Sequence, residues 1–479
     1  MPRSTRHPIT DGIVRFSSLA DMPPLPVSLA STLANKTGTW RYVRPVFQNQ
    51  TSPCNHACPA GSDIVGCVSL LNKGREQAAW LAVLAQNPLP GVCGRVCPRP
   101  CEQECNRSEF GGAIAIHALE RYLADQARAQ GWRPDVPAQS GGARIAIVGS
   151  GPAGLACAYH LARAGHHVKV FEAENNVGGL LRWAIPPYRL PRAVLDWEVD
   201  SIAAMGVEFA LNRRLGDNLF RSELSAFHAV FLAVGQGVRK RLGVPGEDAA
   251  GVLSGLDFLR HLASGGRPVL GRRVLVIGGG NTAIDVARSA LRLGTTVSVV
   301  YRRSQADMPA IPEEVTEARA EGVDFAFRTA PVRILAEAGR VTGVVCTRTD
   351  ASASEATRRD RIDRRLGTEL ELAADTVIVA VGQELDTAVA EAAGVSVVAK
   401  RIATGLDART DMDRVFAGGD AATGDGTVAM AVGSGTKAAA AIDRAVRAAQ
   451  GLAAPAEDCR SVRTMAASIV HAKQLNSAY

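Results

Sequence analysis

From residue 143 onward, short apolar runs rich in valine and isoleucine alternate with alanine-rich stretches that have the period of a helix. The segment 144–173, RIAIVGSGPAGLACAYHLARAGHHVKVFEA, predicts a strand, a glycine turn, a helix and a second strand. The same order recurs at 273–301, RVLVIGGGNTAIDVARSALRLGTTVSVVY. Two such units predict two dinucleotide-binding folds, each a doubly wound α/β fold with a parallel sheet.

Four later segments complete this pattern: AVFLAVGQG (229–237), TVIVAVGQE (376–384), VFAGGDAA (415–422) and a helical stretch (427–449). The first two predict strands that end in similar turns. The economical topology is one nucleotide-binding domain, 140–255 and 385–450, that is interrupted by a second one at 256–384.

The chain before residue 140 has a different pattern of apolar and polar residues. Residues 51–139 combine helical patterns at 63–72 and 113–130 with a group of cysteines, and they predict a small α-helical domain. Residues 1–50 are polar and show no clear periodicity, so we expect an N-terminal arm. Residues 451–479 form the C-terminal tail. Arm and tail lie outside the nucleotide folds and are candidate docking segments.

Composition narrows the function classes. The chain has 479 residues, of which 47% are hydrophobic and 21% charged, and this balance indicates a folded protein of two to four domains. The net charge of +7 is mild and scattered, so it gives little support to nucleic-acid binding and suits an anionic cofactor or an acidic partner. No apolar run is long enough to span a membrane, and the N-terminus MPRSTRHPIT lacks a signal-peptide core. We therefore expect a cytoplasmic protein.

The first glycine turn has the spacing of a dinucleotide site. Gly149-x-Gly151-x-x-Gly154 follows a strand and opens a helix, so the backbone can approach a pyrophosphate at the positive end of that helix. Glu172 ends the second strand, where a carboxylate can accept a hydrogen bond from an adenosine ribose. The alternative is a glycine turn without a ligand.

The second turn is a GxGxxA variant, Gly278 to Ala283, that includes Gly280, Asn281 and Thr282. Its second strand ends in Arg302 and Arg303 where the first unit has an acid. Two guanidinium groups favour a ribose 2′-phosphate, so this turn predicts an NADP site. The alternative is a solvated arginine pair at a strand end.

The ordered motifs are GSGPAG (149–154), Glu172, GGLLRWAIPPYRLP (178–191), GGGNTA (278–283), YRRSQADMPA (301–310), AVGQ (380–383) and AGGDAATGDGTVAMAVGSGTKAA (417–439). With the cysteine segment 54–105, they resemble the glutamate synthase small-subunit (beta) family over roughly residues 50–450. That family includes the N-terminal half of dihydropyrimidine dehydrogenase and the large subunit of NADH-dependent ferredoxin:NADP oxidoreductase.

The resemblance implies FAD in the interrupted domain, NADP(H) in the inserted domain and [4Fe–4S] clusters in the helical N-terminal domain. It also implies that FAD is held by Gly149, Gly151, Ala153, Gly154, Glu172, Gly179, Leu180, Arg189, Asp420, Thr427 and Val428. A helix that begins at Gly426-Thr427-Val428 would lie near the flavin and favour its anionic reduced ring. The alternative for Arg189 is an ordinary surface cation. For NADP, the implied residues are Gly280, Asn281, Thr282, Arg302 and Arg303.

Seven of the ten cysteines lie close together: Cys54, Cys58, Cys67, Cys93, Cys97, Cys101 and Cys105. Such a group in a reducing compartment is more often metal-binding than disulfide-bonded. Prolines at 98 and 100 break any helix through GVCGRVCPRPCEQEC, so we expect a loop that wraps a cluster, joined by Cys54 and Cys58. Zinc is the alternative metal, but a neighbouring flavin domain favours an electron carrier.

One expected ligand is not a cysteine. The resemblance implies that the flavin-proximal cluster uses Cys58, Cys97, Cys101 and Glu120. Independently, Ile116, Leu119, Glu120 and Leu123 follow the i, i+3, i+4, i+7 spacing of a buried helix face. A buried carboxylate needs a cation, which is either the metal or an arginine such as Arg99 or Arg121.

The ligands of a second iron–sulfur cluster are less clear from the sequence. Cys54 and Cys105 match two of its ligands, but the family's preceding Cys-x2-Cys pair is replaced by FQNQTSP. Either Cys93 and Cys67 substitute, or a partner subunit completes the site, or the cluster is absent. Cys93 is equally compatible with a structural thiol, and Cys67 is compatible with a core residue.

The sequence therefore predicts a subunit that moves electrons between NADPH, FAD and [4Fe–4S] and then to or from a partner subunit or ferredoxin. The missing Cys-x2-Cys pair favours a system that reduces a 2-oxoacid, formate or an aromatic ring. The alternative is the small subunit of NADPH-dependent glutamate synthase. A thioredoxin-reductase-like enzyme would need a redox Cys-x-x-Cys near the flavin, which the sequence lacks. A second rival is a non-enzymatic scaffold.

Overall fold

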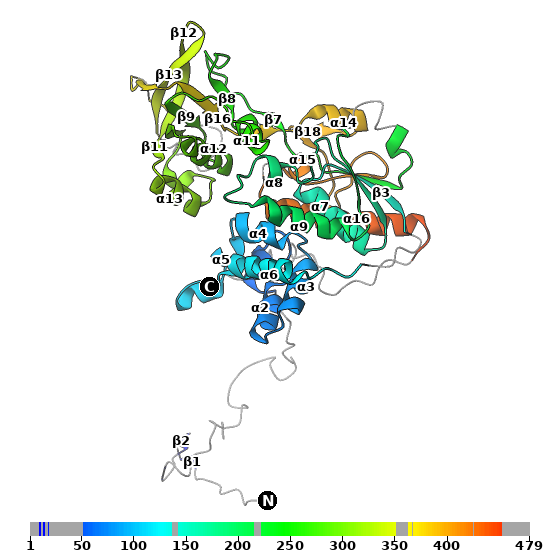
Figure 1. Ribbon diagram of the computed structural model, residues 1–479. Coiled ribbons are helices and arrows are strands. Elements are labelled where there is room, and N and C mark those ends of the chain that lie inside the picture. The colour runs from blue at the N-terminus through cyan, green and yellow to red at the C-terminus, as the bar shows by residue number, and fades with distance from the viewer. Residues whose placement is uncertain are drawn as a thin grey trace, which may run out of the picture. The chain divides into compact units, whose positions relative to one another are not determined.

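The computed structural model describes residues 9–10, 13–14, 18, 51–136, 142–214, 222–350, 363–365, 367–424 and 426–452 (Figure 1). The chain divides into two compact units, Met1–Thr51 and Ser52–Tyr479. The first unit contains a short antiparallel pair, β1 (Ile9–Thr10) and β2 (Ile13–Val14). The rest of the predicted arm, and the predicted tail beyond residue 452, lie outside the described residues.

The second unit begins with short helices. They are α1 (Pro53–Ala57), α2 (Ile64–Asn72), α3 (Glu76–Leu84), α4 (Pro90–Val96), α5 (Pro100–Gln103), the 3₁₀ turn η4 (Asn106–Phe110) and α6 (Ile116–Gln130). Side chains that accept from free backbone N–H groups start two of them, Ser52 at α1 and Asp63 at α2. The helices predicted at 63–72 and 113–130 are confirmed as α2 and α6.

The expected loop around the cysteine run is partly wrong. The structure forms α4 up to Val96 and α5 from Pro100 to Gln103, so only residues 97–99 and the last two residues of the run are non-helical. Proline does break the helix, as predicted. However, a proline also fits the first turn of a helix, where no intrahelical partner for its N–H is needed, so Pro90 and Pro100 each begin a new one.

The first large sheet has five parallel strands in the order β20-β6-β3-β4-β5. Its strands are β3 (Arg144–Val148), β4 (His167–Phe171), β5 (Glu208–Ala210), β6 (Ala229–Leu232) and β20 (Val415–Ala417). Its helices are α7 (Pro152–Arg163), α8 (Leu180–Trp183), α9 (Arg192–Ala203), α15 (Asp420–Thr423) and α16 (Val428–Ala449). This is the first doubly wound fold that the sequence predicted.

The second large sheet is also parallel, in the order β11-β10-β9-β16-β8. Its strands are β8 (Val252–Ser254), β9 (Arg273–Ile277), β10 (Thr296–Tyr301), β11 (Asp324–Phe327) and β16 (Thr376–Val379). Its helices are α11 (Gly255–Ala263), α12 (Asn281–Arg292) and α13 (Pro312–Ala320). An antiparallel sheet adjoins it, made of β12 (Thr329–Glu337), β13 (Arg340–Asp350), β14 (Asp363–Arg364) and β15 (Leu370–Ala373).

Smaller elements complete the described chain: β7 (Val238–Arg239), η5 (Gln305–Asp307), β17 (Gln383–Glu384), α14 (Thr387–Ala393), β18 (Val397–Val398) and β19 (Arg401–Ile402). All strands of the second sheet lie in sequence between β6 and β20 of the first. Strand β8 pairs with β16 of the second sheet although it precedes residue 256, the predicted start of the inserted domain. The exact domain boundaries stay a prediction.

One continuous apolar core joins the N-terminal helices to the first sheet. It includes Trp80, Leu89 and Leu123 from the helices and Phe231 and Phe416 from the strands, all almost fully buried. Helices α7, α9 and α16 lie between that sheet and the N-terminal helices, and α4 packs on both α9 and α16 (Figure 1). None of the helices in the described part of the chain is long and apolar enough to span a membrane.

Candidate functional site

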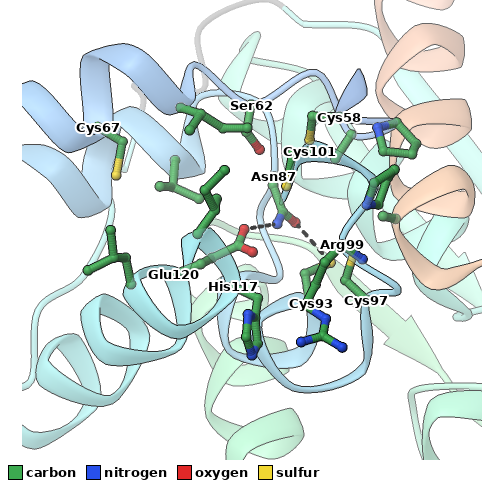
Figure 2. Close-up of a pocket in the computed structure, with 18 of the residues that line it drawn as sticks. Cys58, Ser62, Cys67, Asn87, Cys93, Cys97, Arg99, Cys101, His117 and Glu120 are labelled. Carbon is green, nitrogen blue, oxygen red and sulfur yellow. Dashed lines mark hydrogen bonds between the residues drawn. The ribbon is translucent and has the colours of Figure 1, made fainter. Parts of the chain in front are cut away.

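A cavity in the N-terminal helical region gathers most of the predicted metal ligands (Figure 2). Its wall includes Cys58, Cys67, Cys93, Cys97, Cys101 and Glu120. In the view of Figure 2, four of the cysteines lie on one side of the cavity, Glu120 lies opposite, and Cys67 is set apart on α2. Short helices broken by prolines make this possible, because they turn the chain so that thiols from α1, α4 and α5 face one space.

Glu120 lies on the predicted inner face of α6, between the buried Ile116 and Leu123. Its carboxylate accepts a 2.7 Å hydrogen bond from Asn87, and burial raises its pKa from 4.5 to about 7, against the opposing effect of that bond. A carboxylate in this setting is stabilised by a nearby positive charge.

The alternative for Glu120, a salt bridge to an arginine, is not seen among the described residues. Arg99 forms an ion pair with Glu313 at 2.6 Å, and Arg121 lies 3.7 Å from Asp125. Within the described part of the chain, Glu120 has no ion pair. Its position beside the thiols therefore fits a metal ligand better than half of a structural salt bridge.

The thiols share the environment of Glu120. Burial raises the pKa of Cys97 and Cys101 to about 12 and that of Cys67 to about 11, and it also raises the pKa of Cys93. Thiols at such positions are protonated and unreactive by themselves, and a bound cation is what converts a cysteine into a thiolate ligand. The donor set of buried cysteines and one carboxylate fits an iron–sulfur cluster.

The spacing of the donors also bears on the zinc alternative. A single zinc ion holds four donors at about 2.0–2.3 Å, so these must converge on one point. Cys58, Cys97, Cys101 and Glu120 line the wall of one cavity. Thiols that instead surround a cavity fit a larger cluster of several irons.

The structure separates the two predicted ligand groups. The cavity wall contains Cys58, Cys97, Cys101 and Glu120, whereas Cys54 and Cys105 are not among the described residues that line it. Cys93 and Cys67, the candidates to complete a second cluster, belong to the wall of the first cavity, and this argues against that substitution. The thiol of Cys93 donates to Asn87 Oδ1 at 3.8 Å. Completion by a partner and absence of the second cluster stay predictions.

The first glycine turn has the geometry that its spacing predicted. Gly149 has φ +99°, and a Cβ on Gly154 would lie 2.0 Å from the Gly149 carbonyl oxygen, so both positions require glycine. Gly151 precedes α7, and a Cβ there would meet open space. Glu172 is buried and accepts from the Ser150 N–H at 2.9 Å and from its hydroxyl, which fixes the carboxylate at the edge of the turn.

The other residues predicted to hold FAD surround this turn, with one exception. Gly179 has φ +52°, a Cβ on it would lie 3.0 Å from Gly151 Cα, and Leu180 then begins α8. A Cβ on Gly419 would lie 2.9 Å from Ala153.

Asp420 begins α15, directly after Gly419. Thr427 caps α16 by accepting from Met430 N–H at 3.3 Å, and Val428 is the first residue of that helix. A Cβ on Gly435, further along α16, would lie 2.1 Å from the Ala153 carbonyl oxygen, so α16 packs directly against the glycine turn.

Arg189 is the exception. Its guanidinium forms ion pairs with Asp285 of α12 and Glu314 of α13, both at 2.8 Å. Burial raises the pKa of Asp285 to about 7, although Arg189 opposes this shift. The side chain joins the IPPYRLP segment to the second nucleotide fold and is not an ordinary surface cation. Its predicted contact with FAD stays untested.

The second turn forms at the carboxyl edge of β9 and β10. Gly278 has φ +145°, and a Cβ on Gly279 would lie 2.4 Å from the Tyr301 ring. A Cβ on Gly280 would meet open space, and Asn281 and Thr282 start α12.

Because Val300 pairs with Ile277, Arg302 and Arg303 emerge beside the same turn. The structure therefore brings together the five residues predicted to hold NADP.

Asn87 and His117 are among the residues of the cavity wall that the sequence did not predict, and Arg99 was considered only as an ion-pair partner of Glu120. Asn87 touches Glu120 although 33 positions separate the two residues, so no local pattern could have identified it. Arg99 could have been found, because it lies between two predicted ligands.

Comparisons with known proteins agree with this architecture. Residues 143–445 match the family model for pyridine nucleotide-disulphide oxidoreductases. Residues 44–132 match the model for dihydropyrimidine dehydrogenase domain II, 4Fe-4S cluster. FprA from Mycobacterium tuberculosis has a similar fold, with a TM-score of 0.56 and 20% identity over 70% of this chain and 91% of that one.

Two curated relatives are more similar in sequence. The NADP(+)-dependent formate dehydrogenase subunit beta of Moorella thermoacetica is 39% identical over 85% of this chain and 61% of its own length. The glutamate synthase [NADPH] small chain of Escherichia coli is 37% identical over 81% of this chain and 87% of its own length. The chain thus spans about three fifths of the former and most of the latter.

The fold and the matches define a flavin- and iron–sulfur-dependent NAD(P)H oxidoreductase. The chain belongs to the pyridine nucleotide-disulphide oxidoreductase family, and to the branch that includes the glutamate synthase small chain and carries an N-terminal 4Fe-4S domain. This confirms the resemblance, the fold class and the cofactor set of FAD, NADP(H) and [4Fe–4S].

Proposed function

We propose that this chain is an electron-transfer subunit that links NADPH to a redox partner through FAD and one [4Fe–4S] cluster. NADPH would bind at the second glycine turn, FAD at the first, and the cluster in the cavity of Figure 2, on Cys58, Cys97, Cys101 and Glu120. Bound FAD would supply the conversion between the two-electron hydride chemistry of NADPH and the one-electron chemistry of a cluster.

The position of α16 is the observation that supports this proposal most strongly. The helix begins at Val428 beside the predicted flavin site, and Ala429, its second residue, contributes to the wall of the cysteine cavity. One turn further on, a Cβ on Gly433 would lie 1.9 Å from the carbonyl oxygen of Pro59, the residue after Cys58. FAD held at the start of α16 would therefore lie next to the cysteine cavity, as direct electron transfer to a cluster requires.

The side chains supply position and charge and do not act as acid–base catalysts. The two glycine turns allow phosphates to approach the backbone, and the N-terminus of α16 offers free N–H groups at the flavin site. Burial of the thiols keeps water away from the cluster. Glu172 and Asp420 are expected to accept from hydroxyl groups of FAD.

The second part of the proposal concerns the identity of the redox partner. A subunit or ferredoxin of a 2-oxoacid-, formate- or aromatic-ring-reducing system fits the absence of the Cys-x2-Cys pair, and the formate dehydrogenase subunit is among the relatives. Glutamate synthase remains the second candidate, because the chain spans 87% of the Escherichia coli small chain. A cytoplasmic location is part of the proposal and can be tested by fractionation.

Anaerobic stopped-flow with NADPH tests the proposal directly. We expect the flavin absorbance to bleach first and the cluster to be reduced afterwards, and the isolated chain should also reduce artificial dyes. It should not convert any small metabolite unaided. A scaffold without enzymatic function would show no bleaching, and a single chain that aminates 2-oxoglutarate would contradict the need for a partner. Purification of the complex from its native source identifies that partner.

A further inference from the structure

Arg99 lies between the two cysteines of the cluster loop and has an unusual conformation. Its φ of +60° is left-handed, which is uncommon for a residue with a side chain. The backbone N–H of Arg99 donates to Cys97 Sγ at 3.4 Å, and its side chain contributes to the cavity wall. The loop therefore directs one backbone dipole and one full positive charge toward the proposed cluster.

The partner of that charge belongs to another part of the fold. Arg99 Nη2 lies 2.6 Å from the Glu313 carboxylate, in the first turn of α13. The start of α13 is tied to the second glycine turn, because Ile311 N–H donates to Asn281 Oδ1 at 2.9 Å and Ala310 N–H donates to the Gly279 carbonyl at 3.2 Å. Glu313 is thus attached to the predicted NADP site, whereas Arg99 belongs to the cysteine loop.

This ion pair has little value for stability. The side chain of Glu313 is 60% exposed and that of Arg99 21% exposed, and solvent screens a pair of this kind. The ion pair should instead affect the electrostatic potential at the cluster. A cation beside a cluster favours the reduced state, which carries one more negative charge, and so raises the reduction potential. A carboxylate paired with that cation offsets part of the effect.

We propose that Arg99 and Glu313 make the reduction potential of the cluster depend on the position of the NADP-binding part of the chain. In the arrangement seen here, Glu313 offsets Arg99 and holds the potential down. When the start of α13 moves away, Arg99 is uncompensated and the cluster accepts an electron more readily. The inference rests on the proposed placement of a [4Fe–4S] cluster in the cavity.

The test is an anaerobic redox titration of the holoenzyme, followed by EPR of the reduced cluster. Arg99→Gln should lower the midpoint potential, and Glu313→Gln should raise it. Because the ion pair with Arg99 holds the exposed Glu313 carboxylate beside the cavity, Glu313 should have no effect without Arg99, and the double variant should match Arg99→Gln alone. Glu317→Gln is the matched control, since Glu317 lies on the same helix, is also 60% exposed and pairs with Arg288 at 2.9 Å. It should titrate like the wild type.

The outcomes are distinguishable. An unchanged midpoint in Glu313→Gln, or the same rise in the Arg99→Gln background as in the wild type, overturns the coupling while the cluster assignment stands. The same rise in midpoint potential in Glu317→Gln would show that the effect is one of general surface charge, and it would also overturn the coupling. Wild-type protein with full flavin but without iron or an EPR signal would overturn both the inference and the proposed function. Iron content of each variant shows that the cluster itself is retained.

Discussion

Replacing Glu120 by glutamine should stabilise the iron-free protein and alter the cluster of the holoenzyme. The variant keeps an oxygen that can accept from Asn87 and removes the negative charge. In the iron-free fold, burial raises the pKa of this carboxyl from 4.5 to about 7. The ionised carboxylate therefore destabilises the iron-free fold, and a bond to an iron ion would offset this effect.

The magnitude follows from the two pKa values. A difference of about 2.5 between folded and unfolded states corresponds to about 3 kcal/mol of unfolding free energy. Because the folded pKa is the higher one, this stability is fully present below about pH 4.5 and is lost as the pH rises through 7. At pH 8 we expect iron-free Glu120→Gln to be more stable than wild type by up to about 3 kcal/mol, and this gain should vanish near pH 4.

The holoenzyme should respond differently. A neutral amide oxygen donates less charge than a carboxylate, so a cluster retained by Glu120→Gln should have a higher reduction potential. Glu120→Ala removes the ligand and should lose the cluster or convert it to a three-iron form. Glu120→Cys should keep four irons with a shifted potential.

Denaturant unfolding of iron-free protein at pH 5 and pH 8, with iron analysis and EPR of the holoenzyme, measures both effects. Asp125→Asn on the same helix is the control, because Asp125 already pairs with Arg95 at 2.7 Å. It should give no stability gain and no change in iron. Unaltered iron content and EPR signal in Glu120→Ala would remove this residue from the ligands. An iron-free Glu120→Gln no more stable than wild type at pH 8 would refute the pKa argument.

Three further predictions concern the nucleotide folds. Arg302→Glu should weaken NADPH binding by about 2–3 kcal/mol through lost charge-assisted bonds, and equal kcat/KM of the wild type for NADPH and NADH would contradict the NADP assignment. Gly433→Ala should push α16 away from Pro59, cost about 1–3 kcal/mol of stability and slow cluster reduction more than flavin bleaching in stopped-flow. Arg189→Ala leaves Asp285 buried without its cation and should cost about 3–5 kcal/mol at pH 8; an unfolding curve like that of the wild type would contradict this.

The parts of the fold that the sequence predicted well are those with local signals. Strand, glycine turn and helix follow one another within about thirty residues in both nucleotide folds. Within the first turn, a Cβ on Gly154 would collide with the Gly149 carbonyl oxygen, which is close in sequence. The inner face of α6 was predicted from spacing alone, and with it the position of Glu120. These features depend on contacts between residues that are close in sequence.

Arg189 shows why the sequence did not predict the ion-pair partners of every residue assigned to a site. Its partners Asp285 and Glu314 lie 96 and 125 positions away in sequence, and only the packing of the second nucleotide fold against IPPYRLP brings them together. The family pattern places an arginine near the flavin, but it does not show which groups compensate its charge. The helical start at Pro100 is a smaller case, because proline was weighed as a helix breaker and not as a first helical residue.

Helix α13 extends this argument from single contacts to the coupling between sites. Its first turn carries two adjacent carboxylates, of which Glu313 holds Arg99 of the cluster loop and Glu314 holds Arg189 of the flavin-binding part. The same turn is bonded to Asn281 of the second glycine turn. A change in the NADP site that displaced this turn would therefore alter both ion pairs, and with them the charge near the other two sites, at the same time. Such a junction can only be recognised in three dimensions, because Glu313, Glu314 and their arginine partners come from segments that are far apart in the sequence.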